Sequence, residues 1–143
     1  MLMHPYNTKG SKRRLLNDYF KYGNLVIGFD FDNTIYKYSD VKLLNEKGFN
    51  EIINLLKKAQ KYLCCTMCLF TTETDDEKLK WKVEYTKKLG IRVDYVNFSP
   101  LSANAIKPHF NILLDDRAGL ESAYETLKYV VNKIEKLIKN NGI

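Results

Sequence analysis

The hydrophobic positions of this chain alternate between strand-like and helix-like segments. Continuous apolar runs at residues 25–29 and 64–70 predict two buried strands. Residues 48–63 lie between them and predict a helix, because their apolar side chains recur every three or four positions. That apolar stripe consists of Phe49, Ile52, Ile53, Leu56 and Ala59.

The second half of the chain continues the alternation. The Thr-Asp-Asp-Glu stretch at residues 74–77 has the form of a capping box, which predicts a helix that begins there and ends before Gly90. The other predicted elements are a basic helix at 11–22, strands at 91–96 and 112–114, and a long amphipathic helix at 119–139.

Strands that alternate with helices favour an α/β fold, a three-layer sandwich with a mostly parallel sheet covered on both faces. The 143 residues contain no repeat, low-complexity stretch or Gly/Pro-rich linker. We therefore predict a single domain over residues 1–143, with residues 1–24 as an N-terminal basic extension and helix.

The composition is that of a globular protein without a membrane-spanning segment. The chain is 45% hydrophobic and 28% charged, as in ordinary globular proteins, and no apolar run is long enough to span a membrane. Its N-terminus lacks the pattern of a secretory signal, which favours the cytoplasm. Cys64, Cys65 and Cys68 fall in or beside a predicted strand, so we interpret them as small buried hydrophobic residues.

The net charge of +6 indicates an anionic partner, a phosphorylated substrate or a nucleic acid among them. Basic residues concentrate at residues 9–14, at residues 57–61 and near the C-terminus. The alternative is a solvated basic surface, which we prefer for the C-terminal lysines.

Polar residues follow the predicted strands at the points where these end. Because parallel strands present their carboxyl ends at one edge of the sheet, we expect these residues to meet in one crevice. Single pairs could be helix caps or turns, but the whole set in this order is poorly explained that way. The set is Asp30, Asp32 and Thr34 after the first strand, Thr71 after the second, and Lys107, Asp115 and Asp116 around the fourth.

Four carboxylates in one crevice require a cation at neutral pH, because like charges at short range raise each other's pKa. Oxygen ligands favour Mg²⁺, which also tolerates bound water and a substrate phosphate. The sequence therefore predicts a magnesium site.

These motifs resemble the haloacid dehalogenase (HAD) superfamily. The resemblance rests on "DFDNT", on the strand "CLFT", on a lysine, and on the strand "ILLDD" with its acidic pair, and it spans residues 26–117. "KPHFNILLDDR" is most similar to 5'(3')-deoxyribonucleotidases and to the 3'-phosphatase domain of phage-type polynucleotide kinases. No kinase P-loop is present.

The resemblance implies roles for the acidic residues. Asp30 would be the nucleophile that forms an aspartyl-phosphate, and Asp32 the general acid and then the base. Asp30, the main-chain carbonyl of Asp32, and Asp115 or Asp116 would bind Mg²⁺.

The resemblance also implies a binding site for the phosphoryl group. Thr71 and Lys107 would hold its oxygens, and Thr34 would orient the first loop. Thr72 is the alternative to Thr71 in a neighbouring register. Arg117 is a further phosphate candidate, with a surface ion pair as its alternative role.

Caps govern substrate choice in this superfamily, and neither residues 35–48 nor residues 97–106 are long enough to form one. An open site follows, which either admits large substrates or is roofed by the partner subunit of a homo-oligomer. Tyr36 and Tyr38 would stack on a base there, or pack the short flap onto the body of the protein.

The expected function is a capless, Mg²⁺-dependent HAD phosphatase for a nucleotide or a nucleic acid end. One alternative keeps the enzyme but changes the substrate to a phosphoprotein or a sugar phosphate. The other is a non-catalytic binding module with an HAD-like fold.

Overall fold

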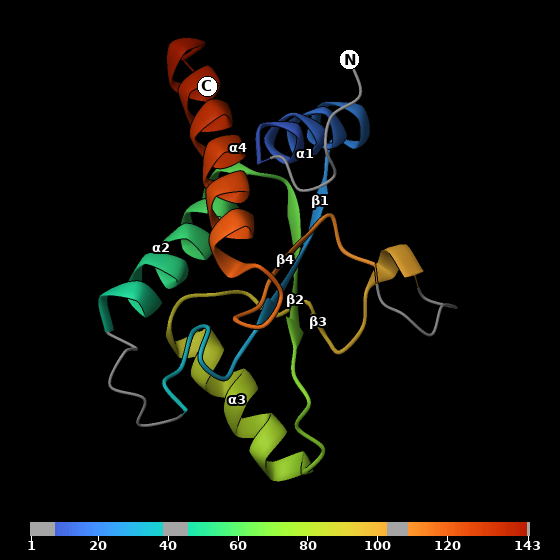
Figure 1. Cartoon of the computed structure of the whole chain (residues 1–143), viewed down its shortest axis with the longest axis vertical. Coiled ribbons are helices and arrows are strands. Elements are labelled where there is room, and N and C mark those ends of the chain that lie inside the picture. Colours follow the sequence, from blue (N-terminus) through green and yellow to red (C-terminus); the bar gives the residue numbers. More distant parts are fainter. Residues whose placement is uncertain (1–7, 39–45, 103–108, 143) are drawn as a thin grey trace.

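The computed structural model describes residues 8–38, 46–102 and 109–142. Its elements alternate as the hydrophobic pattern predicts (Figure 1). In chain order they are α1 (Thr8–Tyr22), β1 (Leu25–Asp30), α2 (Glu46–Tyr62), β2 (Cys65–Phe70), α3 (Asp76–Lys88), β3 (Tyr95–Val96), the 3-10 helix η1 (Pro100–Ser102), β4 (Ile112–Leu114) and α4 (Leu120–Asn140).

The strands form a four-stranded sheet in the order β3-β2-β1-β4, and each pair is parallel. Helices flank this sheet, so the predicted α/β class is confirmed and the arrangement is Rossmann-like. In the register, Asp30 at the end of β1 lies opposite Phe70 at the end of β2. Both central strands therefore end at the same edge.

Strand β1 lies between β2 and β4, and nearly all of it is buried. Its first five residues are buried, and Leu25, Ile27 and Phe29 have no exposed surface. Gly28 makes room for a neighbour, since a Cβ atom at this position would lie 2.8 Å from the ring of Phe110. That ring also contacts Phe70, with 5.7 Å between the centroids.

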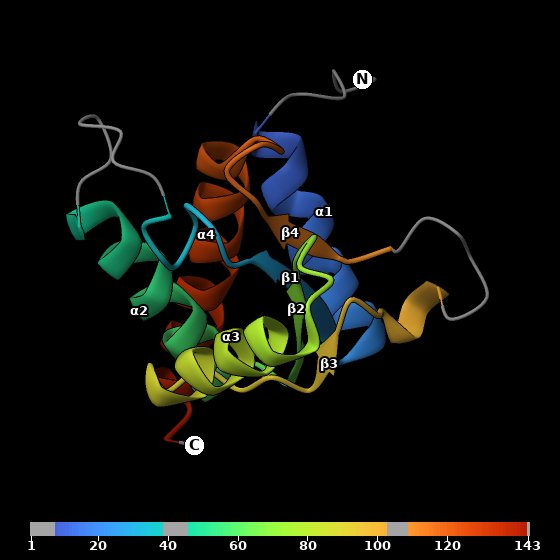
Figure 2. The same ribbon diagram turned by 90° about the horizontal axis from the view of Figure 1, so that it is seen from below.

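Amphipathic helices complete the core. Helix α2 buries Phe49, Ile52, Leu55, Leu56 and Ala59. Leu55 is thus buried although it was not predicted, and Ile53, which was predicted, is only half-buried. Helix α4 packs against α1, α2 and β4. Figure 2 shows α2, α3 and α4 on one side of the strands, and Figure 1 shows α1 beside the end where β1 begins.

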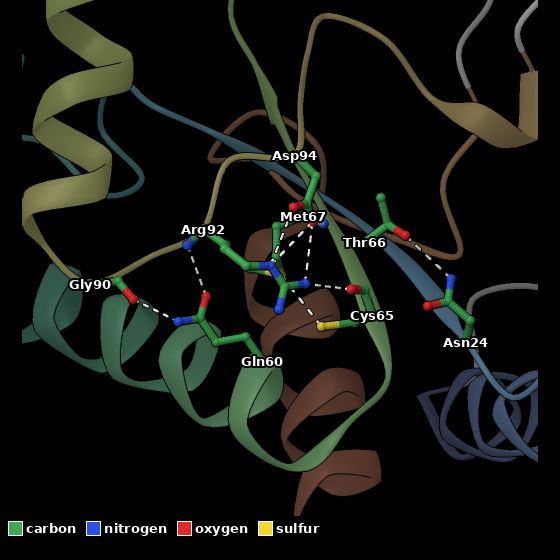
Figure 3. Close-up of polar contacts among 8 residues, drawn as sticks. All are labelled: Asn24, Gln60, Cys65, Thr66, Met67, Gly90, Arg92 and Asp94. Carbon is green, nitrogen blue, oxygen red and sulfur yellow. Dashed lines mark hydrogen bonds and ion pairs between the residues drawn. The ribbon is translucent and has the colours of Figure 1, made fainter.

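The third strand is shorter than predicted, because side chains replace part of its backbone ladder. Asp94 donates its N–H to the Met67 carbonyl and accepts the Met67 N–H on its carboxylate at 2.8 Å. Figure 3 shows how this segment is held: Arg92 donates to the Asp94 carboxylate and to the Cys65 carbonyl at 2.5 Å. Gln60 of α2 ties down the same segment through Gly90 and Arg92.

Helix α3 begins one residue later than the predicted capping box. Asp75, and not Thr74, is the N-cap, and its carboxylate accepts the Lys78 N–H at 2.9 Å. Glu73 in turn accepts the Asp75 N–H at 3.2 Å. The other carboxylate oxygen of Glu73, Oε2, lies 3.3 Å from Lys82 Nζ.

The prediction of three buried cysteines is only partly correct. Cys68 is buried and Cys65 is half-buried, whereas Cys64 is exposed at the start of β2. Burial raises the pKa of the Cys65 and Cys68 thiols to about 11, which makes both poor nucleophiles at neutral pH. Across the described ranges, no helix has the length and apolarity needed to cross a bilayer.

Candidate active site

A pocket of about 440 Å³ opens at the carboxyl ends of the strands. This is the lower end of β1 in Figure 1. Segments far apart in the sequence meet there, as expected for the crevice of a parallel sheet. The pocket is lined by Asp30, Asp32, Asn33, Tyr38, Thr72, Glu73, Thr74, Lys82, Asp115, Asp116 and Arg117.

Three carboxylates gather at the base of this site. Asp30, Asp115 and Asp116 each offer an oxygen, and these oxygens lie within 4.8 Å of one another. Burial, followed by the charges of Asp115 and Asp116, raises the pKa of Asp30 to about 7. The three carboxylates therefore repel one another, and the cluster itself contains no cationic side chain to balance their charge.

Thr34 links two of these acids. Its buried hydroxyl donates to Asp30 Oδ2 at 3.3 Å and accepts the Asp116 N–H at 3.2 Å. Asp115 shapes the loop after β4, since its carboxylate accepts the Arg117 N–H at 2.9 Å. The role of Thr34 in orienting the first loop stays a prediction.

The loop after β1 turns sharply. The Phe31 carbonyl accepts the N–H groups of Thr34, Ile35 and Tyr36, and Asn33 adopts a left-handed conformation with φ of 57°. Asparagine tolerates this conformation better than most residues. The turn leaves Phe31 buried and points Asp30 and Asp32 to different partners.

Asp32 does not join the three-carboxylate cluster. Its Oδ2 accepts a bond from Lys82 Nζ at 2.9 Å, and the same ammonium lies 3.3 Å from Glu73 Oε2. Burial opposes the charge of Lys82, but the bonds to Asp32 and Glu73 outweigh it and raise the Lys82 pKa. All four predicted carboxylates line the same pocket, but only three lie close enough to share a cation, and the Asp32 carboxylate has Lys82 as its counter-ion.

Lys82 was not predicted from the sequence, in which it looks like any of the five lysines of α3. No apolar stripe marks it, because the buried residues of α3 are Lys82 and Thr86, which are both polar. Only 7% of Lys82 is exposed. A buried ammonium needs a charged partner, and Asp32 in the loop after β1 supplies one.

Thr71 and Thr72 have different surroundings. The Thr71 hydroxyl accepts the Glu73 N–H at 3.3 Å, and the Thr71 N–H donates to Asn97 Oδ1 at 2.7 Å. Thr72, the alternative in the sequence analysis, is the one of the two that lines the pocket among the residues described. Asn97, which has a φ of 51°, is a second residue that was not predicted from the sequence.

The other residues predicted to bind substrate differ in where they lie. Arg117 lines the pocket, whereas Lys107 lies outside the residues that the structure describes. Tyr36 packs against Phe31, Trp81 and Tyr85, with ring centroids 5.2–5.4 Å apart. Tyr38 is 72% exposed on the pocket rim. The ring of Tyr36 is therefore used in packing against the body of the protein, whereas the ring of Tyr38 is exposed and available to a ligand.

The basic residues of α1 belong to another part of the surface. Lys12 lies over the ring of Tyr129, and Arg14 donates to Ser11. Within the described part of the chain, no residue of α1 lines the acidic pocket. A polyanion would have to extend beyond the pocket to reach this helix.

The donor set of the cluster suits a hard divalent cation. All its ligand atoms are carboxylate oxygens, and a cation of charge +2 would restore the ionised form of Asp30. The pocket therefore combines a carboxylate cluster that could bind a metal ion with two cationic side chains, Lys82 and Arg117, on its wall.

Comparisons with known protein families, with curated proteins and with solved structures find no match to this chain.

Proposed function

We propose that this chain is a Mg²⁺-dependent phosphomonoesterase of the HAD type. The observation that carries the proposal is the cluster of Asp30, Asp115 and Asp116 at the carboxyl ends of β1 and β4. The order of the acidic motifs along the sequence supports the same mechanism.

In this mechanism, an Asp30 oxygen attacks phosphorus, and the bond between phosphorus and the ester oxygen breaks. The carboxyl group of Asp32 gives a proton to the departing oxygen. Asp32 then takes a proton from the water that hydrolyses the aspartyl-phosphate, which frees Asp30 and inorganic phosphate. Each proton that Asp32 donates is therefore recovered in the second step.

Asp30, Asp116 or Asp115, and the main-chain carbonyl of Asp32 would hold Mg²⁺, which neutralises charge on the phosphoryl oxygens. Thr34 keeps Asp30 and the Asp116 main chain in register through its two hydrogen bonds. Arg117 and Thr72, both on the pocket wall, supply donors for the phosphoryl group. Lys107 remains the third predicted donor.

The substrate class that we propose is a nucleotide or a phosphorylated nucleic acid end. Tyr38 supports it, because an exposed ring on the rim of a phosphate pocket offers a stacking surface for a base. The net charge of +6 also favours a polyanionic substrate. A phosphoprotein or a sugar phosphate is the alternative substrate, and a non-catalytic binding module is the alternative function.

A substrate screen tests the proposal. Purified protein with Mg²⁺ is assayed for phosphate release from nucleoside monophosphates, 3'- and 5'-phosphorylated oligonucleotides, sugar phosphates and a phosphopeptide. We expect turnover that EDTA removes and Mg²⁺ restores, with Ca²⁺ a poor substitute because its coordination is larger and looser. Asp30→Asn should be inactive, and Glu51→Gln, an exposed carboxylate change in α2, should be fully active. Turnover in EDTA, or an active Asp30→Asn, would refute the mechanism.

Salt dependence separates the substrate classes. If α1 attracts the rest of a nucleic acid, kcat/KM for a phosphorylated oligonucleotide should fall more steeply with salt than for a mononucleotide. Replacing Lys12, Arg13 and Arg14 with Ala should remove the difference. Equal slopes for both substrates would leave a mononucleotide or another small phosphate ester.

A further inference from the structure

Helix α3 places one buried lysine against the loop after β1. The Lys82 ammonium contacts Asp32 Oδ2 at 2.9 Å and Glu73 Oε2 at 3.3 Å, and it lies 5.3 Å from the centroid of the Phe31 ring. Only 8% of its side chain is exposed. The ammonium is thus held on three sides, by two carboxylates and an aromatic face.

This arrangement fixes Lys82 more firmly than an ordinary surface pair. Lysine loses much rotamer freedom when it is ordered, and exposed ion pairs rarely compensate for that loss. Here the aliphatic stem is buried in the face of α3 that also buries Thr86, whose hydroxyl donates to the Lys82 carbonyl at 2.7 Å. Glu73 is itself tied to the start of α3 through the Asp75 N–H.

Asp32, by contrast, has few other constraints. Its Oδ1 is buried and has no hydrogen-bond partner among the described residues, so the bond from Lys82 is the side-chain contact that sets its orientation. The Asp32 carboxylate lines the same pocket as Asp30, Asp115 and Asp116, and without the ammonium it would lose the counter-charge that it contacts. Repulsion would favour rotation away from those acids.

We propose that Lys82 is the positioning residue of Asp32: it holds the Asp32 carboxyl group at the pocket wall, beside the departing ester oxygen, and Glu73 fixes the ammonium. This inference rests on the proposed phosphomonoesterase function. It gives Lys82 a role distinct from phosphate binding, because the lysine acts through Asp32 and not on the phosphoryl group.

The role predicts dependence on the leaving group. An alkyl alcohol departs poorly unless it is protonated, whereas p-nitrophenolate departs without a proton, and general acid catalysis typically contributes about 10²–10⁴-fold. Misplacing Asp32 should therefore slow alkyl phosphates far more than p-nitrophenyl phosphate. A purely structural loss, or a loss of phosphate binding, would slow both substrates equally.

The experiment compares kcat/KM for β-glycerophosphate and p-nitrophenyl phosphate, with Mg²⁺, in the full chain. We expect Lys82→Met to lower the alkyl value by about 100-fold or more and the aryl value by less than about 10-fold. Lys82→Arg should recover part of the alkyl activity because it keeps a donor to Asp32. Lys80→Met, which removes an exposed lysine from the same helix, is the matched control and should retain full activity.

A double-mutant cycle tests whether Lys82 acts through Asp32. In an Asp32→Asn background, Lys82→Met should cause no further loss on the alkyl substrate, since its effect passes through Asp32. If Lys82→Met does not fold, as judged by circular dichroism, Glu73→Gln takes its place and should give the same preferential loss on the alkyl substrate.

The outcomes separate the two proposals. Equal fold-losses on both substrates, or additive losses in the cycle, would overturn the role of Lys82 while leaving the phosphatase intact. A wild-type protein that hydrolyses neither substrate, nor any other ester in the screen, would refute the proposed function and the role of Lys82 with it.

Discussion

Replacing Asp30 with Asn should stabilise the metal-free protein, and more so at pH 8 than at pH 5. Burial and the neighbouring charges of Asp115 and Asp116 raise the pKa of Asp30 from 3.8 to about 7. Between these two values the folded protein holds a proton that the unfolded chain has released. Stability of the metal-free wild type therefore falls as pH rises from about 4 to about 7.

The magnitude follows from the linkage relation. Each pKa unit corresponds to about 1.4 kcal/mol, so a folded-state pKa of about 7 implies a loss of ~2.7 kcal/mol between pH 5 and pH 8. Asp30 is only half-buried, and water screens part of this interaction. We therefore expect Asp30→Asn to gain about 1 kcal/mol relative to wild type when the pH is raised from 5 to 8.

Urea unfolding in EDTA, followed by circular dichroism at both pH values, measures the difference. Glu51→Gln serves as the control, because it removes an exposed carboxylate of α2 that is not among the residues lining the pocket, and it should show no comparable change with pH. Magnesium at 100 times its Kd should stabilise the wild type by about 2.7 kcal/mol, and Asp30→Asn by less. If Asp30→Asn differs from wild type by the same amount at both pH values, the argument from crowded carboxylates is wrong.

Three further predictions concern other contacts. Asp32→Asn should slow hydrolysis of alkyl phosphates yet retain Mg²⁺ binding by calorimetry, because the Asp32 carboxylate pairs with Lys82 and lies outside the three-carboxylate cluster; loss of binding would contradict this. Gly28→Ala should lower stability in urea by about 1–3 kcal/mol, since the new Cβ would meet Phe110 at 2.8 Å, and Phe110→Leu should relieve part of the loss. Asn97→Gly should cost about 1–3 kcal/mol by leaving the Thr71 N–H without its acceptor, whereas Asn97→Asp should cost less; equal losses would exclude the hydrogen bond as the cause.

Much of the fold was predictable from local patterns. The buried strand at residues 25–29 and the short strand Ile112–Leu114 appear where the apolar runs predicted them. Helices α2 and α4 follow their apolar stripes to within a few residues. Such patterns report which face of an element is buried, and burial is the main determinant of these elements.

The sequence also located the acidic residues that meet in the pocket. Asp30 and the pair Asp115–Asp116 directly follow apolar runs, and parallel strands place their carboxyl ends together whatever the details of packing. The order of strand and acid along the chain was therefore enough to predict the juxtaposition.

The tertiary structure alone decided which charges pair. Asp30 and Asp32 are two positions apart, yet Asp30 lies with Asp115 and Asp116, whereas Asp32 meets a lysine fifty positions further along the chain. The shortened third strand has a similar origin, because the side chains of Asp94 and Asn97 occupy backbone positions of the ladder. Hydrophobic periodicity shows that a side chain is buried, but its polar partner depends on how separate elements pack, as the contact between Lys82 of α3 and Asp32 after β1 shows.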